Sequence, residues 1–154
     1  MPIFVKRAPA VNFAENRTMV YLTRVEHFNA AHKLSNPEWT PEENYRVFGK
    51  CSHENWHGHN YELHVTVKGT QDPNTGFVYN AKTLGDLIKE HVVEKIDHKN
   101  LNIDVDFMQN KFTTAENVAI GIWEQLQPHI DNETVKLHCV KLLETSKIYV
   151  EYYG

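Results

Sequence analysis

Apolar and polar residues alternate along two segments in the first half of the chain, residues 19–32 and 61–68. Successive side chains of a strand point to opposite faces, so this alternation is typical of strands with one buried face. Two closing strands are expected at 134–143 and 148–153, joined by Glu144-Thr-Ser-Lys147. The pattern therefore predicts four strands, two in each half of the chain.

A helical period separates these two pairs of strands. It predicts a helix over residues 81–95 with its apolar positions on one face. Those positions are Leu84, Leu87, Ile88, Val92 and Ile96. A second helix is predicted to begin at the capping box Thr113-Thr-Ala-Glu116 and to end before Pro128, since proline disfavours a helical residue before it.

The order strand, strand, helix, helix, strand, strand predicts an α+β domain with a four-stranded antiparallel sheet and both helices on one face. The 154 residues are enough for one such domain. We assign residues 19–154 to it, and residues 1–18, which show little periodicity, to an N-terminal extension. The two edge strands would keep unpaired backbone groups, which favours assembly into a homo-oligomer.

A long polar connection, residues 33–57, separates the first two strands. Loops of more than roughly 12–15 residues inside compact domains are usually functional or disordered. This one contains a short helix signal, with Thr40 as the N-cap, Pro41 at the first helical position and Glu43 closing a capping box. We expect it to be an active-site loop.

The composition, with 41% hydrophobic and 23% charged residues, is that of a globular protein. Its formal net charge of −4 gives no electrostatic reason to bind nucleic acid or an anionic membrane. No apolar run approaches the ~18 residues of a membrane span, and the opening residues do not resemble a secretory signal. Cys51 and Cys139 lie far apart and form no disulfide framework or zinc ribbon pattern, so the cytoplasm is the expected location.

Ten histidines are more than such a chain needs for packing, and three of them are spaced to bind one metal ion. His57 and His59 stand two apart in an extended segment, so both imidazoles lean to one face, with Gly58 allowing close backbone approach. His32 ends the neighbouring strand. Three protein nitrogens with a position left open are typical of catalytic zinc, although imidazole also binds copper, nickel and iron. The competing interpretation is that His-x-His is a surface coincidence.

Cys51 lies six residues before His57, close enough to face the same pocket. Three interpretations stay open: a small buried residue, a fourth ligand that closes a structural zinc site, or a thiolate that accepts a proton. In the third, a nearby metal ion would lower the thiol pKa from about 8.5.

Other polar residues are weaker candidates for chemistry. Asp97 beside His98 suits a proton relay in which the carboxylate orients the imidazole, but also an ordinary polar pair after a helix. Glu144, at a strand end, suits either a ligand anchor or loop charge, and Glu116 is explained most simply by the capping box. The remaining histidines, including His64, are interpreted as structural or surface residues.

Six motifs stand in a characteristic order along residues 20–154. They are Phe28-Asn-Ala-Ala-His32, Phe48-Gly-Lys-Cys51, His57-Gly-His59-Asn-Tyr61, Asp97-His98-Lys-Asn-Leu101, Thr114-Ala-Glu-Asn117 and Glu144-Thr145. Together they resemble the 6-pyruvoyl-tetrahydropterin synthase family, which includes the bacterial 6-carboxytetrahydropterin synthases of queuosine and deazapurine biosynthesis.

This resemblance implies the tunnelling fold, in which four-stranded sheets join around a threefold axis, commonly as two trimers, with active sites between subunits. It also implies zinc ligands, a catalytic triad and a pterin pocket. The ligands are His32, His57 and His59; the triad is Cys51, Asp97 and His98; the pocket is Glu144 with backbone around Thr114 and Glu116.

The substrate implied by the resemblance is a small molecule, 7,8-dihydroneopterin triphosphate, which loses triphosphate by elimination. The product is 6-pyruvoyl-tetrahydropterin, for tetrahydrobiopterin, or 6-carboxytetrahydropterin plus acetaldehyde, for queuosine; the resemblance leaves both open. Two other functions fit a three-histidine site. One is a zinc hydrolase, and the other is a non-catalytic module that uses zinc only for folding.

Overall fold

The computed structural model describes residues 18–154, and its sheet contains five strands in the order β3-β1-β2-β4-β5. Residues 1–17, almost all of the predicted N-terminal extension, lie outside the described residues. The strands are β1 (Val20–His32), β2 (His57–Gly69), β3 (Lys99–Asn100), β4 (Val135–Thr145) and β5 (Ile148–Tyr152). The predicted α+β class is confirmed, and the long strands lie where the alternation places them.

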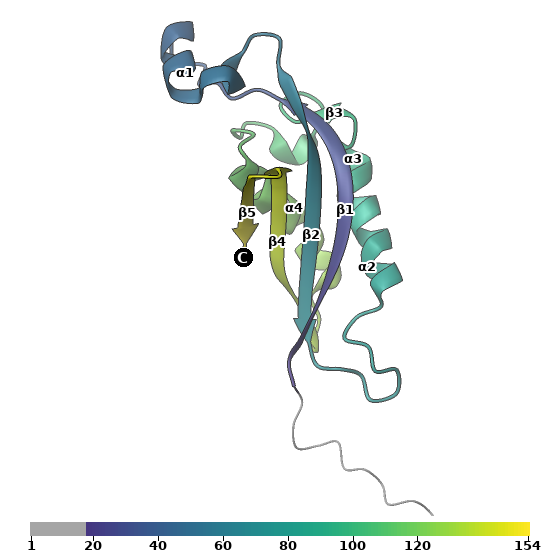
Figure 1. Cartoon of the computed structure of the whole chain (residues 1–154). Coiled ribbons are helices and arrows are strands. Elements are labelled where there is room, and N and C mark those ends of the chain that lie inside the picture. The colour runs from purple at the N-terminus through teal and green to yellow at the C-terminus, as the bar shows by residue number, and fades with distance from the viewer. Residues whose placement is uncertain (1–17) are drawn as a thin grey trace, which may run out of the picture.

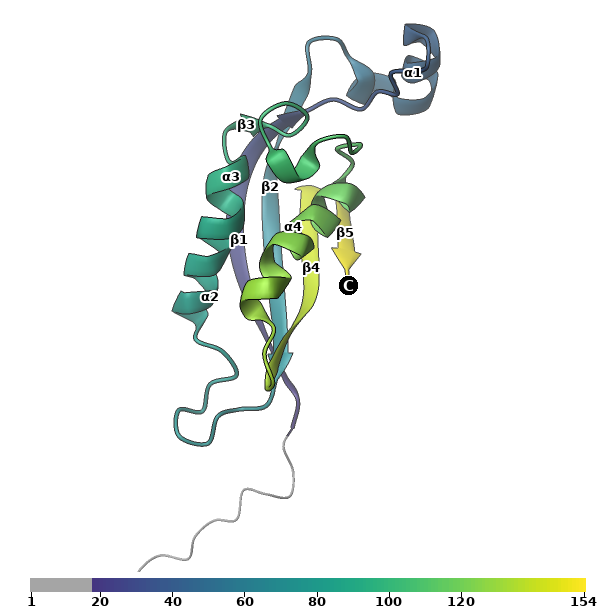
Figure 2. The same ribbon diagram turned by 180° about the vertical axis from the view of Figure 1, so that it is seen from behind.

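Helical segments cover one face of this sheet and leave the other uncovered (Figures 1 and 2). We call these the inner and the outer face. The covering segments are α2 (Ala81–Ile88), the π-helical η2 (Lys89–Val93), α3 (Glu94–Ile96), η3 (Asp106–Met108) and α4 (Ala115–Ile130). α1 (Pro41–Phe48) and η1 (Gly49–Ser52) project beyond one end of the sheet instead (Figures 1 and 2). α2, η2 and α3 follow one another without a break, so the predicted helix over 81–95 is present with a π-helical turn inside it. Among residues 18–154, no helix has the length and apolar character to cross a membrane.

The core lies between the inner face and the helices. Along β2, Leu63, Val65 and Val67 are fully buried, and the residues between them are not. From the helices, Ile88 and Ile122 are fully buried against them. Burial of each such side chain contributes about 1.5–3 kcal/mol, so this face fixes the register of the sheet.

The prediction of exactly four antiparallel strands and two helices is wrong in detail. β3 adds a fifth strand, which pairs in parallel with β1 at Ala30 and Ala31. Two residues are too few to produce an alternating pattern, and β3 is held by backbone hydrogen bonds that do not depend on side chains. Leu101 N, for example, donates to Ala31 O at 2.8 Å.

The helix boundaries also differ from those predicted. α4 continues through Pro128 to Ile130, because a proline near the end of a helix removes only one backbone donor, and Asp131 N still bonds to Gln127 O. Its N-cap is Thr114, whose side chain accepts from Asn117 N, and not Thr113.

The short helix α1 is capped by Thr40 as predicted. Its hydroxyl accepts from Glu43 N at 3.2 Å, and Pro41 is the first helical residue. The Glu43 side chain does not close the capping box. It binds Arg46 instead, at 2.6 and 3.0 Å.

Candidate active site

Three histidines converge at one end of the sheet, on its inner face. His32 is the last residue of β1 and lies directly opposite His57, the first residue of β2, while His59 lies two residues further on. One ligand atom from each lies within 4.8 Å of the other two. A Cβ atom on Gly58 would come within 3.0 Å of Ala30 O, so glycine permits this approach of the strands. The sequence prediction that these imidazoles share one face is confirmed.

The inward-facing nitrogens of this cluster are buried and have no hydrogen-bond partner within the described chain. They are His32 Nε2, His59 Nε2 and both ring nitrogens of His57. Buried polar atoms are nearly always satisfied in folded proteins, so several unpartnered nitrogens within one cluster indicate a binding site for a ligand. A metal ion that prefers imidazole fits this donor set.

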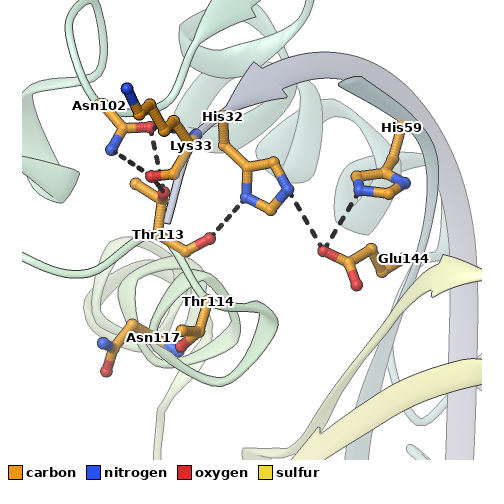
Figure 3. Close-up of polar contacts among 8 residues, drawn as sticks. All are labelled: His32, Lys33, His59, Asn102, Thr113, Thr114, Asn117 and Glu144. Carbon is orange, nitrogen blue, oxygen red and sulfur yellow. Dashed lines mark hydrogen bonds and ion pairs between the residues drawn. The ribbon is translucent and has the colours of Figure 1, made fainter. Parts of the chain in front are cut away.

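The second ring nitrogen of His32, Nδ1, is held in place by a hydrogen bond to the backbone. His32 Nδ1 lies 2.7 Å from Thr113 O and must donate to it, which leaves the Nε2 lone pair for a metal ion (Figure 3). Thr113 is itself fully buried, and its hydroxyl contacts Asn102 Oδ1 at 3.1 Å and Lys33 O at 3.4 Å. Sequence reasoning missed this role of Thr113, because a carbonyl that orients a distant ligand has no sequence signal.

Burial favours the neutral form of His32 and His57. It lowers the pKa of His32 from 6.5 to about 4, with smaller contributions from His57 and His59. The pKa of His57 is also lowered by burial and by His59. Metal ions bind neutral imidazole, so near pH 7 His32 and His57 are already in the form that binds a metal ion.

Glu144, near the end of β4, points at the same cluster. Its Oε1 lies 3.5 Å from His32 Nε2 and 3.6 Å from His59 Nε2 (Figure 3). The side chain is 17% exposed, so one part of the carboxylate remains open to a ligand. The sequence placed Glu144 at a strand end but did not predict that it would lie beside the histidines.

Cys51 belongs to the same region but not to the ligand cluster, which contains only the three histidines. Its carbonyl accepts from Leu34 N at 2.9 Å, which ties η1 to the chain just after β1. Burial and the nearby Glu144 carboxylate raise the pKa of the Cys51 thiol. This direction is opposite to the expected lowering, which requires a bound cation. Burial, with Glu144 and Cys51 close by, likewise raises the pKa of Tyr61, whose buried hydroxyl has no partner among residues 18–154.

Asp97 and His98 form the expected pair at the β1 edge of the sheet. Asp97 Oδ2 lies 2.9 Å from His98 Nδ1, and Asp97 Oδ1 accepts from Asn29 N at 2.8 Å. His98 has a φ of 59°, an uncommon conformation for a residue other than glycine, and its side chain is 77% exposed. Together with Asn29 and Asn60, it lines a hollow at this edge.

The hollow is lined by Asn29 and Asn60, which alternate with inward-facing residues, and also by His59 of the cluster. A single chain therefore brings Cys51 and Glu144 to the histidine cluster and places His98 beside β1, away from β4 and Glu144.

The remaining predicted residues, Thr114 and Glu116, lie at the N-terminus of α4. Thr114 is the N-cap, and Glu116 is exposed in the first turn. Because Thr113 O bonds to His32, this end of α4 lies against the histidine cluster. The backbone N–H groups of a helix N-terminus suit the binding of polar or anionic ligand atoms.

Comparisons with known proteins agree with this architecture. The family model for 6-pyruvoyl tetrahydropterin synthase matches residues 21–154. The chain is 39% identical over 136 residues to 6-pyruvoyl tetrahydrobiopterin synthase of Drosophila melanogaster, covering 88% of this chain and 80% of that protein. It is 32% identical over 136 residues to 6-carboxy-5,6,7,8-tetrahydropterin synthase of Bacillus subtilis, covering 85% and 83%.

A solved structure has the same fold. The 6-pyruvoyl tetrahydropterin synthase of Caenorhabditis elegans superposes with a TM-score of 0.82 at 38% identity, over 89% of this chain and 96% of that one. The fold and the sequence similarity both extend over the strands and loops that carry the histidines. The chain therefore belongs to the 6-pyruvoyl tetrahydropterin synthase family.

Proposed function

We propose that this lyase converts 7,8-dihydroneopterin triphosphate into 6-pyruvoyl-tetrahydropterin and triphosphate. The observation that carries the proposal is the cluster of three buried imidazoles with unpartnered nitrogens, in a chain of this family. The reaction balances without an external oxidant, since hydrogen moves from the substrate side chain to the ring while triphosphate leaves. An enzyme for this step needs groups that move protons and a site that stabilises negative charge on oxygen.

The 6-pyruvoyl product is favoured over the 6-carboxy product by the pattern of similarity. Identity to the Drosophila melanogaster synthase is 39%, against 32% to the Bacillus subtilis 6-carboxy enzyme over the same length. Formation of the 6-carboxy product also consumes water and releases acetaldehyde, so the two outcomes differ in products that can be measured.

Zinc is the proposed cofactor, held by His32, His57 and His59. These three donors leave an open coordination position, which is the pattern of catalytic zinc. When bound, the ion would act as a Lewis acid towards side-chain oxygens of the substrate. The partly open carboxylate of Glu144 would bind the amino group and a ring N–H of the pterin, and the backbone at Thr114 and Glu116 would line the same pocket.

Proton transfers are assigned to Cys51, Asp97 and His98. Cys51 would take a proton from a side-chain carbon, for which its thiol must first ionise near a cation. His98 would exchange protons with the substrate oxygens, and the Asp97 carboxylate would hold its Nδ1–H so that Nε2 faces the substrate.

A complete site requires two copies of the chain. Asp97 and His98 lie beside β1, at the edge where only the two-residue β3 pairs with it, whereas Glu144 lies near the end of β4, which pairs with β5 at the opposite edge. β1 and β5 run in opposite directions, so β1 of one copy can continue the sheet beside β5 of the next. This pairing would place His98 of one copy near Glu144 of its neighbour.

The exposed surface supports such a ring of subunits. Tyr21 on β1 and Tyr149 on β5 are each 55% exposed, and Ile148 is 54% exposed, which makes both edges apolar. We propose a homo-oligomer, a trimer or a dimer of trimers, that acts in the cytoplasm. Cys51 and Cys139 are both free thiols, which agrees with a reducing compartment.

The test is anaerobic incubation of the zinc-loaded protein with 7,8-dihydroneopterin triphosphate, followed by mass spectrometry. We expect 6-pyruvoyl-tetrahydropterin and triphosphate without acetaldehyde. A 6-carboxytetrahydropterin mass with acetaldehyde would replace the proposed product by the other one. Unchanged substrate, from folded protein that has bound zinc, would contradict the proposed reaction and favour a zinc hydrolase or a binding module.

A further inference from the structure

A second cluster on β1 and β2 repeats the pairing pattern of the histidine site on the opposite face of the sheet. In the first site a residue of β1, His32, lies opposite His57, and His59 stands two residues further along β2. Five residues earlier on β1, His27 lies opposite Glu62, and His64 again stands two residues further along β2. Because the shift is an odd number of residues, the second set points to the outer face.

The three side chains of this second set are already in contact. Glu62 Oε1 lies 2.5 Å from His64 Nε2, and Glu62 Oε2 lies 3.3 Å from His27 Nε2. One carboxylate thus contacts two imidazoles, one through each oxygen. Hydrogen bonding to His64, with a smaller contribution from His27, lowers the pKa of Glu62, so the carboxylate is ionised at neutral pH.

The outer cluster, as we call His27, Glu62 and His64, is also accessible. Their side chains are 70%, 40% and 27% exposed, in that order, and no helix of residues 18–154 covers the outer face. Its ligand atoms are more widely spaced than those of the inner histidines, which alone among the described residues meet within 4.8 Å. The most exposed member, His27, is the one free to rotate towards an ion held by the other two.

We propose that the outer cluster is a second metal site, which binds a divalent transition ion such as zinc through His27 Nε2, a Glu62 oxygen and His64 Nε2. Two imidazoles and one carboxylate are an established zinc donor set, with water completing the coordination. Metal ions bind these ligand types in their deprotonated forms, so affinity rises with pH. The wider spacing and greater exposure make this site weaker than the inner one.

The test uses the full chain, stripped with chelator and dialysed against zinc, with bound metal measured by mass spectrometry. We expect two zinc ions per chain. Glu62→Gln keeps the shape of the side chain but removes its charge, and should bind one ion, as should His64→Asn. In both variants the affinity of the outer cluster falls by about tenfold or more.

The matched control is His138→Asn. His138 packs against Tyr21 on the same outer face, but its charged neighbour is Lys68 and not a carboxylate. This variant should still bind two ions, and His57→Asn should keep the ion of the outer cluster. Cobalt provides a second readout. The visible absorption spectrum of the cobalt-loaded unmodified protein should contain a component from each of its two sites, and Glu62→Gln should lose the component of the outer cluster.

One ion per chain in the unmodified protein would overturn the proposal, as would two ions in Glu62→Gln. If His138→Asn loses as much zinc as Glu62→Gln, then zinc binds unspecifically to surface histidines, and this result would also overturn the proposal. None of these readouts depends on pterin turnover, so the result is independent of the proposed function.

Discussion

His32 and Thr113 are joined by a hydrogen bond of 2.7 Å between the imidazole Nδ1 and the backbone carbonyl, although 81 residues separate them in the chain. The bond aims His32 Nε2 into the cluster. Thr113 in turn precedes Thr114, the N-cap of α4. The proposed metal site and the proposed pterin pocket therefore share one structural support, and a substitution at Thr113 should change the affinity for the metal ion.

Thr113→Val tests this support. Valine matches threonine in shape but loses the hydroxyl contacts with Asn102 and Lys33 O. We expect unfolding free energy to fall by about 1 kcal/mol, and zinc affinity to fall by about tenfold. The control is Thr23→Val, whose hydroxyl bonds to Thr66 on the exposed face. Equal zinc affinities in competition titrations with a chelating dye would show that the Thr113 hydroxyl does not support the orientation of His32.

Acid should destabilise the metal-free protein through His32. Its pKa in the folded state, about 4, is below the unfolded value of 6.5, so the folded state holds fewer protons between these values. The free energy of unfolding is therefore fully retained above pH 6.5 and falls as the pH drops towards 4. At pH 5 the loss from this group is about 2 kcal/mol relative to pH 8.

Urea unfolding of the metal-free protein at both pH values measures this loss. His32→Asn, whose amide nitrogen takes the place of Nδ1 and can still donate to Thr113 O, should show a smaller difference between pH 8 and pH 5. If the unmodified protein and the variant lose the same free energy, then His32 is not the group responsible.

Substitution of Cys51, compared with the same substitution of Cys139, separates catalysis from metal binding. Cys51→Ala should lower turnover by about a hundredfold or more, since a positioned proton acceptor is lost, while zinc content stays unchanged. Cys139 lies on β4 and is buried, away from the proposed chemistry. Cys139→Ala should therefore keep both zinc and turnover. Loss of zinc from Cys51→Ala would instead make Cys51 a ligand.

Glu144 lies close enough to the histidines that its role needs a separate test. We expect Glu144→Gln to weaken binding of a pterin, measured by fluorescence titration, by about tenfold, because one or two charge-assisted hydrogen bonds become neutral. Zinc affinity should change little if the carboxylate serves the pterin. The reverse pattern, weaker zinc and unchanged pterin binding, would assign Glu144 to the metal.

Periodic features of the sequence were sufficient to place the inner site. Alternation fixes which face each residue of a strand occupies, so His32, His57 and His59 could be assigned to one face before any contact was known. Contacts without a periodic signal were missed. Thr113 acts through its carbonyl, and the contact of His64 with Glu62 is recognised only through hydrogen bonding and strand pairing.

If the active site is divided between two subunits, two inactive variants should complement each other. Cys51 lies near Glu144 and the inner histidines, whereas His98 lies beside β1, at the opposite edge of the sheet from β5. Cys51→Ala and His98→Ala should each be inactive alone. After the two are unfolded, mixed in equal amounts and refolded, a site with both intact groups arises when neighbouring copies carry different substitutions. On the order of a quarter of unmodified activity should return if subunits assemble at random in a closed ring.

The matched control for this mixture is Cys51→Ala with His57→Ala. These two residues belong to the same copy in the proposed site, so every site in the mixture carries one of the substitutions and no activity should return. Recovery in the first mixture and not in the second would locate His98 in the neighbouring subunit. Failure of the first mixture, with oligomers confirmed by light scattering, would mean that each chain builds its site alone and that His98 is not part of it.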